Sequence, residues 1–316
     1  MLMELIRSIS DHDVAMYLNK RRSRRVSRFV LTLILVYGVF CVAMMLGQRV
    51  LMYFPEKTTF DPEIWGLSEL TPLRTVTTDG VTITSWYRPP RDLAKPTIAF
   101  MQGNAGHAGQ RNYKVLPWLD AGYGVVMIGY RGFGMNQGTP TEHGLYRDAR
   151  SVLNELQTRG VTGQALLLYG ESLGTGIAVQ MATEFPAAGL VLESPYSSTT
   201  DVGSWRYPFL PVRYLMWDRF DSIGKIGQVH IPLLLAHGEA DATIPVHFGK
   251  KLFEAANAPK QGIFVPGLGH STIYSADVQN EIMRFYARMP HDRIVNGRLG
   301  EQSGSSKPGQ STMPHD

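Results

Sequence analysis

The segment Leu168-Tyr169-Gly170-Glu171-Ser172-Leu173-Gly174 decides the fold of this chain, because in it an apolar run leads directly into Gly-x-Ser-x-Gly. This pattern is typical of a nucleophile elbow, a tight strand-to-helix turn that lifts a serine hydroxyl clear of its own backbone. The two glycines let the strand and the helix approach closely enough to hold Ser172 in an unfavourable backbone conformation. A serine between two glycines is otherwise an ordinary turn residue, so the prediction of a nucleophile depends on finding its partners later in the chain.

Two later loops provide an acid and a histidine, and each begins where a short apolar run ends. Residues 232–236 read Pro-Leu-Leu-Leu-Ala and lead to Asp241, and residues 263–265 read Ile-Phe-Val and lead to the glycine-flanked His270. The order serine, aspartate, histidine is that of α/β-hydrolases and differs from the orders of chymotrypsin-like and subtilisin-like proteases. Ligands of such sheets bind outside the carboxyl ends of the strands, so we expect the three loops to open onto one crevice.

These residue types fit acyl transfer to a serine. A serine hydroxyl is a poor nucleophile near neutral pH, so we expect His270 to take the proton of Ser172 during the attack. Asp241 is expected to orient His270 and to stabilise the imidazolium that forms.

The oxyanion of the tetrahedral intermediate needs backbone donors. One is expected to be the N–H of Leu173, at the start of a helix whose dipole also favours negative charge. The apolar strand expected over residues 97–101 is followed by Gln102-Gly103-Asn104, and we assign the second donor to the backbone N–H of Asn104.

Alternatives exist for some of these residues. Asp241 is also placed to cap a helix expected after Pro245, and Glu193, at the end of another apolar run, is the alternative acid. His237 is expected to pack and form hydrogen bonds near the same strand ends. The residues predicted to line the substrate pocket are His107, Tyr196 and Trp205.

The chain resembles the membrane-anchored, single-domain α/β-hydrolases known as α/β-hydrolase domain-containing proteins, esterases or serine aminopeptidase-like proteins, over roughly residues 48–289. Besides the three loops above, the resemblance rests on Leu51-Met52-Tyr53-Phe54-Pro55, Gly103-Asn104-Ala105-Gly106, Tyr130-Arg131-Gly132-Phe133-Gly134 and Gly138-Thr139-Pro140. It implies hydrolase chemistry at Ser172, Asp241 and His270 with no metal or organic cofactor.

The sequence departs from the pattern of this family at two positions. Gln102 stands where a histidine is usual, and His107 stands where an asparagine is usual. Neither residue is one of the two expected backbone donors, so the departures concern the details of the pocket and not the type of reaction.

Residues 29–48 form a run of twenty residues without a formal charge. As a helix this run spans roughly 30 Å, the thickness of the hydrocarbon core of a bilayer. Six Lys and Arg residues lie within residues 20–28, whereas only Arg49 and Lys57 follow the run closely. The positive-inside rule therefore places residues 1–28 in the cytoplasm and the catalytic domain on the far side, which is the periplasmic face of the inner membrane in a bacterium.

We expect this run to be an uncleaved anchor that contacts membrane lipid together with its basic flank. A cleaved signal peptide is the main alternative, but its basic region would be unusually long and no Ala-x-Ala-like site follows the apolar run. The single cysteine, Cys41, lies within the run, so the rest of the chain has no cysteine for an internal disulfide.

The net charge of +4 comes from the N-terminal segment. Residues 1–28 hold seven Lys and Arg and three Asp and Glu, which leaves 24 of each kind in the rest of the chain. The catalytic part is therefore neutral, and the charge pattern gives no support to nucleic-acid binding.

The rest of the chain is expected to form one α/β-hydrolase domain over residues 49–290. A disordered tail is expected over residues 291–316, which are rich in Gly, Ser, Pro and Gln. A hairpin over 74–78 and 81–88 turns through Asp79-Gly80, and apolar strands recur near 97–102, 124–129, 165–170, 189–193, 231–236 and 262–266. Helical patterns near 108–121, 141–159, 173–185, 245–257 and 274–289 alternate with these strands. The alternation predicts a mostly parallel, eight-stranded sheet with helices on both faces.

Residues 195–228 are expected to form a short cap over the strand ends. The segment carries seven aromatic residues and few charges, and it is too short for a large lid. Its aromatic density favours packing of the cap onto the core, an apolar pocket, or a surface that faces lipid. A shallow, partly open acyl pocket is our hypothesis.

Together these features predict a membrane-anchored serine hydrolase that cleaves carboxylic esters or thioesters of small-molecule or acyl substrates through an acyl-enzyme. The alternative is a serine peptidase, in particular an aminopeptidase, which needs acidic groups to hold the α-amine of its substrate. The candidates for that role are Glu171, Glu193 and Asp201. A catalytically silent membrane scaffold is less consistent with the sequence, because a scaffold has no use for a strained elbow.

Overall fold

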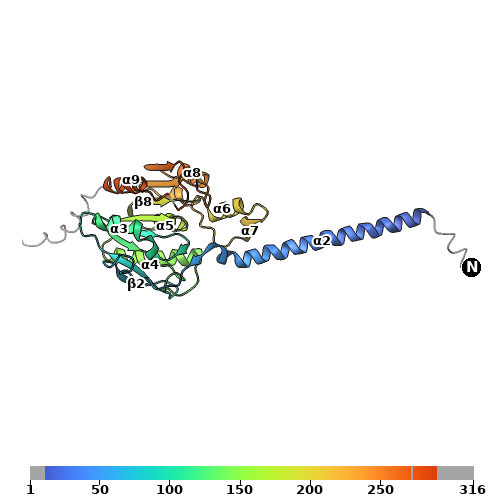
Figure 1. Cartoon of the computed structure of the whole chain (residues 1–316), viewed down its shortest axis with the longest axis horizontal. Helices are drawn as coiled ribbons and strands as arrows, with labels where there is room; N and C mark the ends of the chain where they lie inside the picture. Colours follow the sequence, from blue (N-terminus) through green and yellow to red (C-terminus); the bar gives the residue numbers. More distant parts are fainter. Residues whose placement is uncertain (1–10, 272, 290–316) are drawn as a thin grey trace, which may run out of the picture. The chain divides into compact units, whose positions relative to one another are not determined.

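The computed structural model of the chain describes residues 11–271 and 273–289 (Figure 1). The chain divides into two compact units at the bond between Leu51 and Met52. The predicted disordered tail, residues 291–316, lies outside the described residues, as do the first ten residues of the predicted basic segment.

The first unit consists of one long helix, α2, which runs over Asp11–Met52 and ends at the first residue of the second unit. The helix contains the predicted apolar run of residues 29–48 and extends beyond it at both ends, so that it also includes the basic residues before the run. Among the described residues, it is the one helix long and apolar enough to cross a membrane, with a mean hydropathy of 2.7 over its most apolar stretch.

An eight-stranded sheet lies at the centre of the second unit, with the strand order β10-β9-β8-β7-β4-β6-β3-β2. All neighbours are parallel except the β2–β3 and β3–β6 pairs, which confirms the predicted mostly parallel sheet. The strands are β2 (Thr71–Val76), β3 (Thr82–Arg88), β4 (Thr97–Met101), β6 (Gly124–Met127), β7 (Gly163–Glu171), β8 (Ala187–Glu193), β9 (Leu233–Gly238) and β10 (Lys260–Val265).

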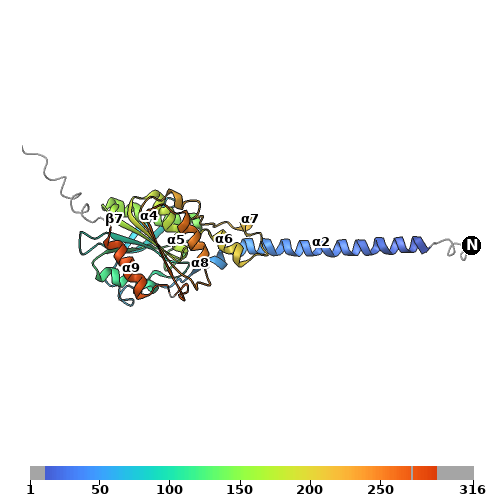
Figure 2. The ribbon, with the colours of Figure 1, turned by 90° about the horizontal axis from the view of Figure 1, so that it is seen from above.

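Helices cover both faces of this sheet, as the alternation of strand and helix patterns predicts (Figure 2). One face carries α4 (Glu142–Thr158), α5 (Leu173–Glu184) and α8 (Val246–Ala255). The other face carries α3 (Asn112–Asp120) and α9 (Ala276–Ala287).

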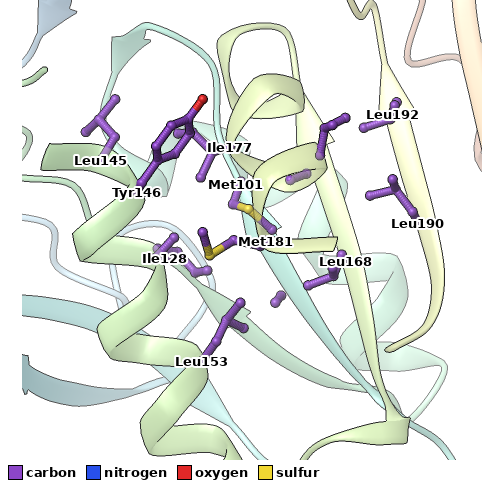
Figure 3. Close-up of a cluster of buried hydrophobic side chains, with 14 of the residues drawn as sticks. Met101, Ile128, Leu145, Tyr146, Leu153, Leu168, Ile177, Met181, Leu190 and Leu192 are labelled. Carbon is purple, nitrogen blue, oxygen red and sulfur yellow. The ribbon is translucent and has the colours of Figure 1, made fainter. Parts of the chain in front are cut away.

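The buried strands place successive side chains on opposite faces of the sheet. In β7, Leu166 and Leu168 belong to one hydrophobic cluster, whereas Leu167 and Tyr169 belong to the other. Figure 3 shows the first cluster, in which strand residues meet residues of α4 and α5: Met101, Leu168, Leu190 and Leu192 with Leu145, Leu153, Ile177 and Met181. The sheet is therefore buried on both faces, and its parallel strands all present their carboxyl ends at one edge.

Two smaller features lie near that edge. The short strands β1 (Phe54–Pro55) and β5 (Ala105–Gly106) pair in parallel, a contact that the sequence did not predict, and the 3₁₀ helix η1 (Ala108–Arg111) follows β5. Between β8 and β9, the predicted cap contains α6 (Thr199–Arg206), α7 (Val212–Leu215) and the 3₁₀ helix η2 (Ile226–Gln228).

Candidate active site

Ser172 lies in a strained turn between β7 and α5. Its backbone has φ 51° and ψ −118°, a conformation that non-glycine residues rarely adopt. The turn needs glycine on both sides, because a Cβ on Gly170 would lie 2.6 Å from the carbonyl oxygen of Gly174. A Cβ on Gly174 would lie 2.0 Å from the carbonyl oxygen of Met101 in β4. Close packing of strand, turn and helix thus fixes Ser172 at the carboxyl end of β7.

His270 lies between Ser172 and Asp241, although the three residues are far apart in the sequence. Its Nε2 is 2.9 Å from Oγ of Ser172, and its Nδ1 is 2.7 Å from Oδ2 of Asp241. Both are hydrogen-bond distances, and they use opposite nitrogens of one ring. When Nδ1 carries the proton and donates to the carboxylate, Nε2 is free to accept the hydroxyl proton of Ser172. The three side chains therefore form a hydrogen-bonded chain with the geometry that a nucleophile, its base and an orienting acid require.

The carboxylate of Asp241 is buried and accepts hydrogen bonds on both oxygens. Oδ1 accepts the backbone N–H groups of Thr243 and Ile244, each at 2.8 Å, so Asp241 also closes the turn after β9. Oδ2 faces Nδ1 of His270 and lies 3.3 Å from Nε2 of His237. Burial opposes ionisation most strongly, but the contacts with His237 and His270 outweigh it and hold the pKa of Asp241 well below its usual range. Asp241 is therefore negatively charged at neutral pH.

The loop after β4 lies against Ser172 from the other side. A Cβ on Gly103 would be 3.4 Å from Cβ of Ser172, so this loop passes directly beside Ser172. The next residue, Asn104, is fixed by the start of the second unit: its carbonyl oxygen accepts the N–H of Phe54 at 2.8 Å, and its Nδ2 donates to the carbonyl of Met52 at 2.7 Å. The backbone N–H groups of Asn104 and of Leu173, the first residue of α5, remain the predicted oxyanion donors.

A buried ionic cluster that the sequence did not predict lies next to Ser172. Lys114 in α3 has a side chain that is 1% exposed, and its Nζ contacts Oε1 of Glu193. The same Nζ lies 3.7 Å from Oε2 of Glu171, which precedes Ser172, and Arg111 donates to that carboxylate at 3.1 Å. The hydroxyl of Tyr169 donates to the other oxygen of Glu193. Helix α3 is thereby joined to the ends of β7 and β8.

This cluster sets the charges beside the elbow. Burial opposes ionisation of Glu171 most strongly, but Lys114 and Arg111 lower its pKa below the usual range. Burial likewise favours loss of the Lys114 proton, but the two carboxylates raise the pKa of Lys114. Glu193, the alternative acid in the sequence, is therefore engaged with a lysine, whereas Asp241 is the acid in contact with His270.

The structure gives the three predicted pocket residues different surroundings. His107 is buried, accepts the N–H of Gly109 on its Nδ1 at 3.1 Å and packs edge-on against Trp65. Tyr196 is buried, and its hydroxyl donates to the carbonyl of Leu173 at 3.0 Å, so it braces the start of α5. Trp205 is exposed, in α6 of the cap.

Among residues 11–271 and 273–289, no three His, Cys, Asp or Glu side chains gather in an arrangement suited to a metal ion.

Comparison with protein families gives a match over residues 93–220 to the family described as serine aminopeptidase, S33. The match includes Ser172 and ends before Asp241 and His270. The uncharacterized protein Rv2307c of Mycobacterium tuberculosis is 36% identical over 226 residues, which cover 71% of this chain and 80% of that protein.

Two further similarities concern proteins whose names state an activity. The lysophosphatidylserine lipase ABHD12 of Danio rerio is 31% identical over 239 residues, which cover 65% of this chain and 62% of that protein. The solved structure of the esterase Pf2001 of Pyrococcus furiosus superposes with a TM-score of 0.61 at 17% identity, over 75% of this chain and 98% of that chain. At this identity the structural similarity shows the α/β-hydrolase fold.

Proposed function

We propose that this chain, an α/β-hydrolase of the same family as Rv2307c, is a membrane-anchored serine hydrolase that cleaves carboxylic esters or thioesters. The observation that carries the proposal is the position of His270, at 2.9 Å from the Ser172 hydroxyl and 2.7 Å from Asp241. The strained elbow at Ser172 supports it, because such strain persists only where the surroundings enforce it.

In the first half of the proposed reaction, Oγ of Ser172 attacks the acyl carbon while Nε2 of His270 takes the hydroxyl proton. The carbonyl oxygen becomes an oxyanion, which the N–H groups of Leu173 and Asn104 stabilise. His270 then gives its proton to the departing alcohol or thiol, and an acyl group remains on Ser172.

In the second half, a water molecule replaces the leaving group. His270 takes a proton from this water as it attacks the acyl carbon, and the same two N–H groups stabilise the second oxyanion. The proton returns to Oγ of Ser172 as the carboxylic acid leaves. The proposed reaction therefore consumes one water and needs no other reactant.

The surroundings of the acidic residues favour ester or thioester cleavage over aminopeptidase activity. An aminopeptidase needs a carboxylate available for the α-amine of its substrate. Glu171 and Glu193 are engaged with Lys114, and Asp201 accepts from the Ser197 hydroxyl at 2.6 Å and pairs with Lys251 at 3.1 Å. Each of these three carboxylates would have to break an existing contact in order to bind the α-amine of a substrate.

We further propose that α2 anchors the chain in a bilayer through residues 29–48, with the basic segment in the cytoplasm and the catalytic unit on the far side. The length and hydropathy of α2 support the anchor, and the basic residues before the apolar run support the orientation. Reaction of a membrane-impermeant maleimide with a cysteine introduced at Leu93, an exposed position of the second unit, tests the orientation in intact cells. Protection of that cysteine until the membrane is permeabilised would contradict it.

A substrate panel with the full-length protein in detergent tests the function. We expect hydrolysis of p-nitrophenyl esters, with a rate that rises with acyl length, together with cleavage of an acyl thioester or a lysophospholipid ester. The lysophospholipid is included because the name of ABHD12 states a lipase of this class. An aminoacyl-p-nitroanilide should be cleaved more slowly, and Ser172→Ala should abolish all turnover.

Faster cleavage of the anilide than of any ester would favour the peptidase. A folded wild-type protein without activity on the whole panel would favour a scaffold.

A further inference from the structure

The first residues of the second unit are fixed to both sides of the candidate active site. Met52 and Phe54 bond to Asn104 in the loop beside Ser172. Between them, the buried Tyr53 donates its hydroxyl to Oδ2 of Asp218 in the cap at 3.2 Å. The second unit thus begins between the oxyanion loop and the cap.

Only a few residues separate this point from the apolar run. Residue 48 is the last of the run, and Met52 follows it by four positions. A chain reaches at most about 3.5 Å per residue, so Met52 lies within roughly 14 Å of the end of the run. If residues 29–48 span a bilayer, the oxyanion loop and the cap are therefore held close to its surface.

The cap exposes aromatic and basic side chains. Trp205 is 45% exposed and Tyr214 is 87% exposed, and Tyr207 and Phe209 are also exposed. Arg206, Arg213 and Arg219 lie among them on the surface. We call these seven residues the cap surface.

Residues 195–228 hold three acidic residues, Asp201, Asp218 and the exposed Asp221, against four Lys and Arg residues. Asp218 is buried, and Asp201 pairs with Lys251. The cap surface therefore combines exposed rings with three exposed arginines, whereas Tyr196 and Phe220 of the same segment are buried in the core.

We propose that the cap surface rests on the anionic phospholipid surface of the bilayer in which α2 is anchored. Tyr and Trp side chains favour the interface between headgroups and hydrocarbon, and arginines beside them are attracted to anionic headgroups. The proposal rests on the proposed anchor and does not depend on the reaction at Ser172.

The test uses the full chain in nanodiscs with a fluorescent probe on the cap surface. Cys41 is the only cysteine, so Tyr214→Cys in a Cys41→Ser background takes a single environment-sensitive nitrobenzoxadiazole label. Leu93→Cys in the same background is the control, because Leu93 is 61% exposed and precedes β4, at the opposite edge of the parallel strands from Ser172.

We expect the label at position 214 to shift its emission to shorter wavelength in nanodiscs with phosphatidylglycerol. Headgroup-region spin-labelled lipid should quench it several-fold more than the label at position 93. Arg213→Glu should reduce both effects, and they should be weaker in phosphatidylcholine alone. Hydrolysis of the water-soluble p-nitrophenyl acetate should be unchanged by Arg213→Glu, which separates failure of docking from failure of the proposed reaction.

Equal quenching at positions 93 and 214 would overturn the proposal. The proposal would also be overturned if the label at position 214 were equally shielded from water in lipid-free detergent and this shielding increased with protein concentration. A second copy of the chain would then cover the cap.

Discussion

The substitution Gly249→Ala tests whether His237 supports the catalytic geometry through Asp241. Gly249 lies in α8, and the buried ring of His237 packs against it. Nε2 of His237 lies 2.8 Å from the carbonyl oxygen of Ile244 and 3.3 Å from Oδ2 of Asp241, so it is placed to donate to both acceptors. The ring thereby contacts the same Oδ2 atom of Asp241 that bonds to His270.

The size of the perturbation can be worked out from one distance. A Cβ on residue 249 would lie 2.2 Å from Nδ1 of His237, whereas ordinary contacts begin at 3.4 Å, so the ring must retreat by about 1.2 Å. The bond to Ile244 and the contact with Asp241 would both be lost over such a distance. A misplacement of about 1 Å in a catalytic constellation costs up to about a hundredfold in rate. We therefore expect kcat to fall about tenfold to a hundredfold, with little change in KM.

The assay is steady-state hydrolysis of a p-nitrophenyl ester by the full-length protein. Gly227→Ala is the matched control, because a Cβ at Gly227 meets nothing within 4 Å and should leave kcat unchanged. In the double variant His237→Ala/Gly249→Ala, the second change should cost nothing further, because the ring it displaces is already absent.

A Gly249→Ala enzyme with wild-type kcat would refute the reasoning. The reasoning would also be refuted if the fold-losses in kcat of His237→Ala and Gly249→Ala multiplied in the double variant. The methyl group at position 249 would then act independently of His237. Helix propensity works in the opposite direction, since alanine within a helix is favoured over glycine by about 1 kcal/mol. A loss of activity in a protein of unchanged or greater stability would thus be a particularly clear result.

Three further predictions concern stability and pH. Lys114→Met leaves the buried Glu193 without its counter-charge and should lower the free energy of unfolding by about 3–5 kcal/mol in urea titrations. The matched Arg150→Met removes a partly exposed pair and should cost less than about 1 kcal/mol, so equal losses would contradict the role of the buried cluster. Because the folded-state pKa of Asp241 is depressed, its carboxylate stabilises the fold above the unfolded pKa of about 3.9, and this stability is lost as pH falls toward the folded pKa. Circular dichroism should therefore show a steeper loss of stability below pH 4 in the wild type than in Asp241→Asn, and parallel curves would argue against the shift. Gly174→Ala forces a methyl group to 2.0 Å from a β4 carbonyl and should give little folded protein, so a stable, active variant would contradict the packing of the elbow.

The strands and the elbow were predictable from the sequence because each rests on a local pattern. Apolar runs bounded by glycine and polar residues mark β4, β7, β8 and β9, which are buried on both faces of the sheet. The expected positions of these strands agree with the observed ones to within about two residues. Gly170 and Gly174 flank Ser172 because strand and helix touch there, and so the same residues that shape the turn identify it in the sequence.

The ionic cluster beside the elbow was not predictable in this way, because it joins side chains from four elements, η1, α3, β7 and β8. Lys114 alone carried a signal: it stands in α3 next to Val115 and near Trp118, among positions that are buried. A charged residue on the apolar side of a helix indicates a buried partner, but the sequence does not say which carboxylate it meets. Only the folded structure shows that the carboxylates near Lys114 are those of Glu193 and Glu171.

The aromatic residues of the cap could not be divided into buried and exposed groups from the sequence. Residues 195–228 show no regular periodicity, and their helices are short. Tyr196 and Phe220 pack into the core next to α5, whereas Trp205 and Tyr214 are exposed. The pairing of Phe54 with Ala105 was likewise unpredicted, because strands of two residues leave no pattern.

The most direct test of the central claim is reaction of the full-length protein with a fluorophosphonate, with mapping of the modified peptide. Activation of Ser172 by His270 predicts one phosphonyl group, on Ser172. It also predicts no labelling of Ser172→Ala, and labelling of His270→Ala that is slower by about 10³-fold or more. A folded wild-type protein that does not react, or that is modified at another residue and still reacts in Ser172→Ala, would contradict the account.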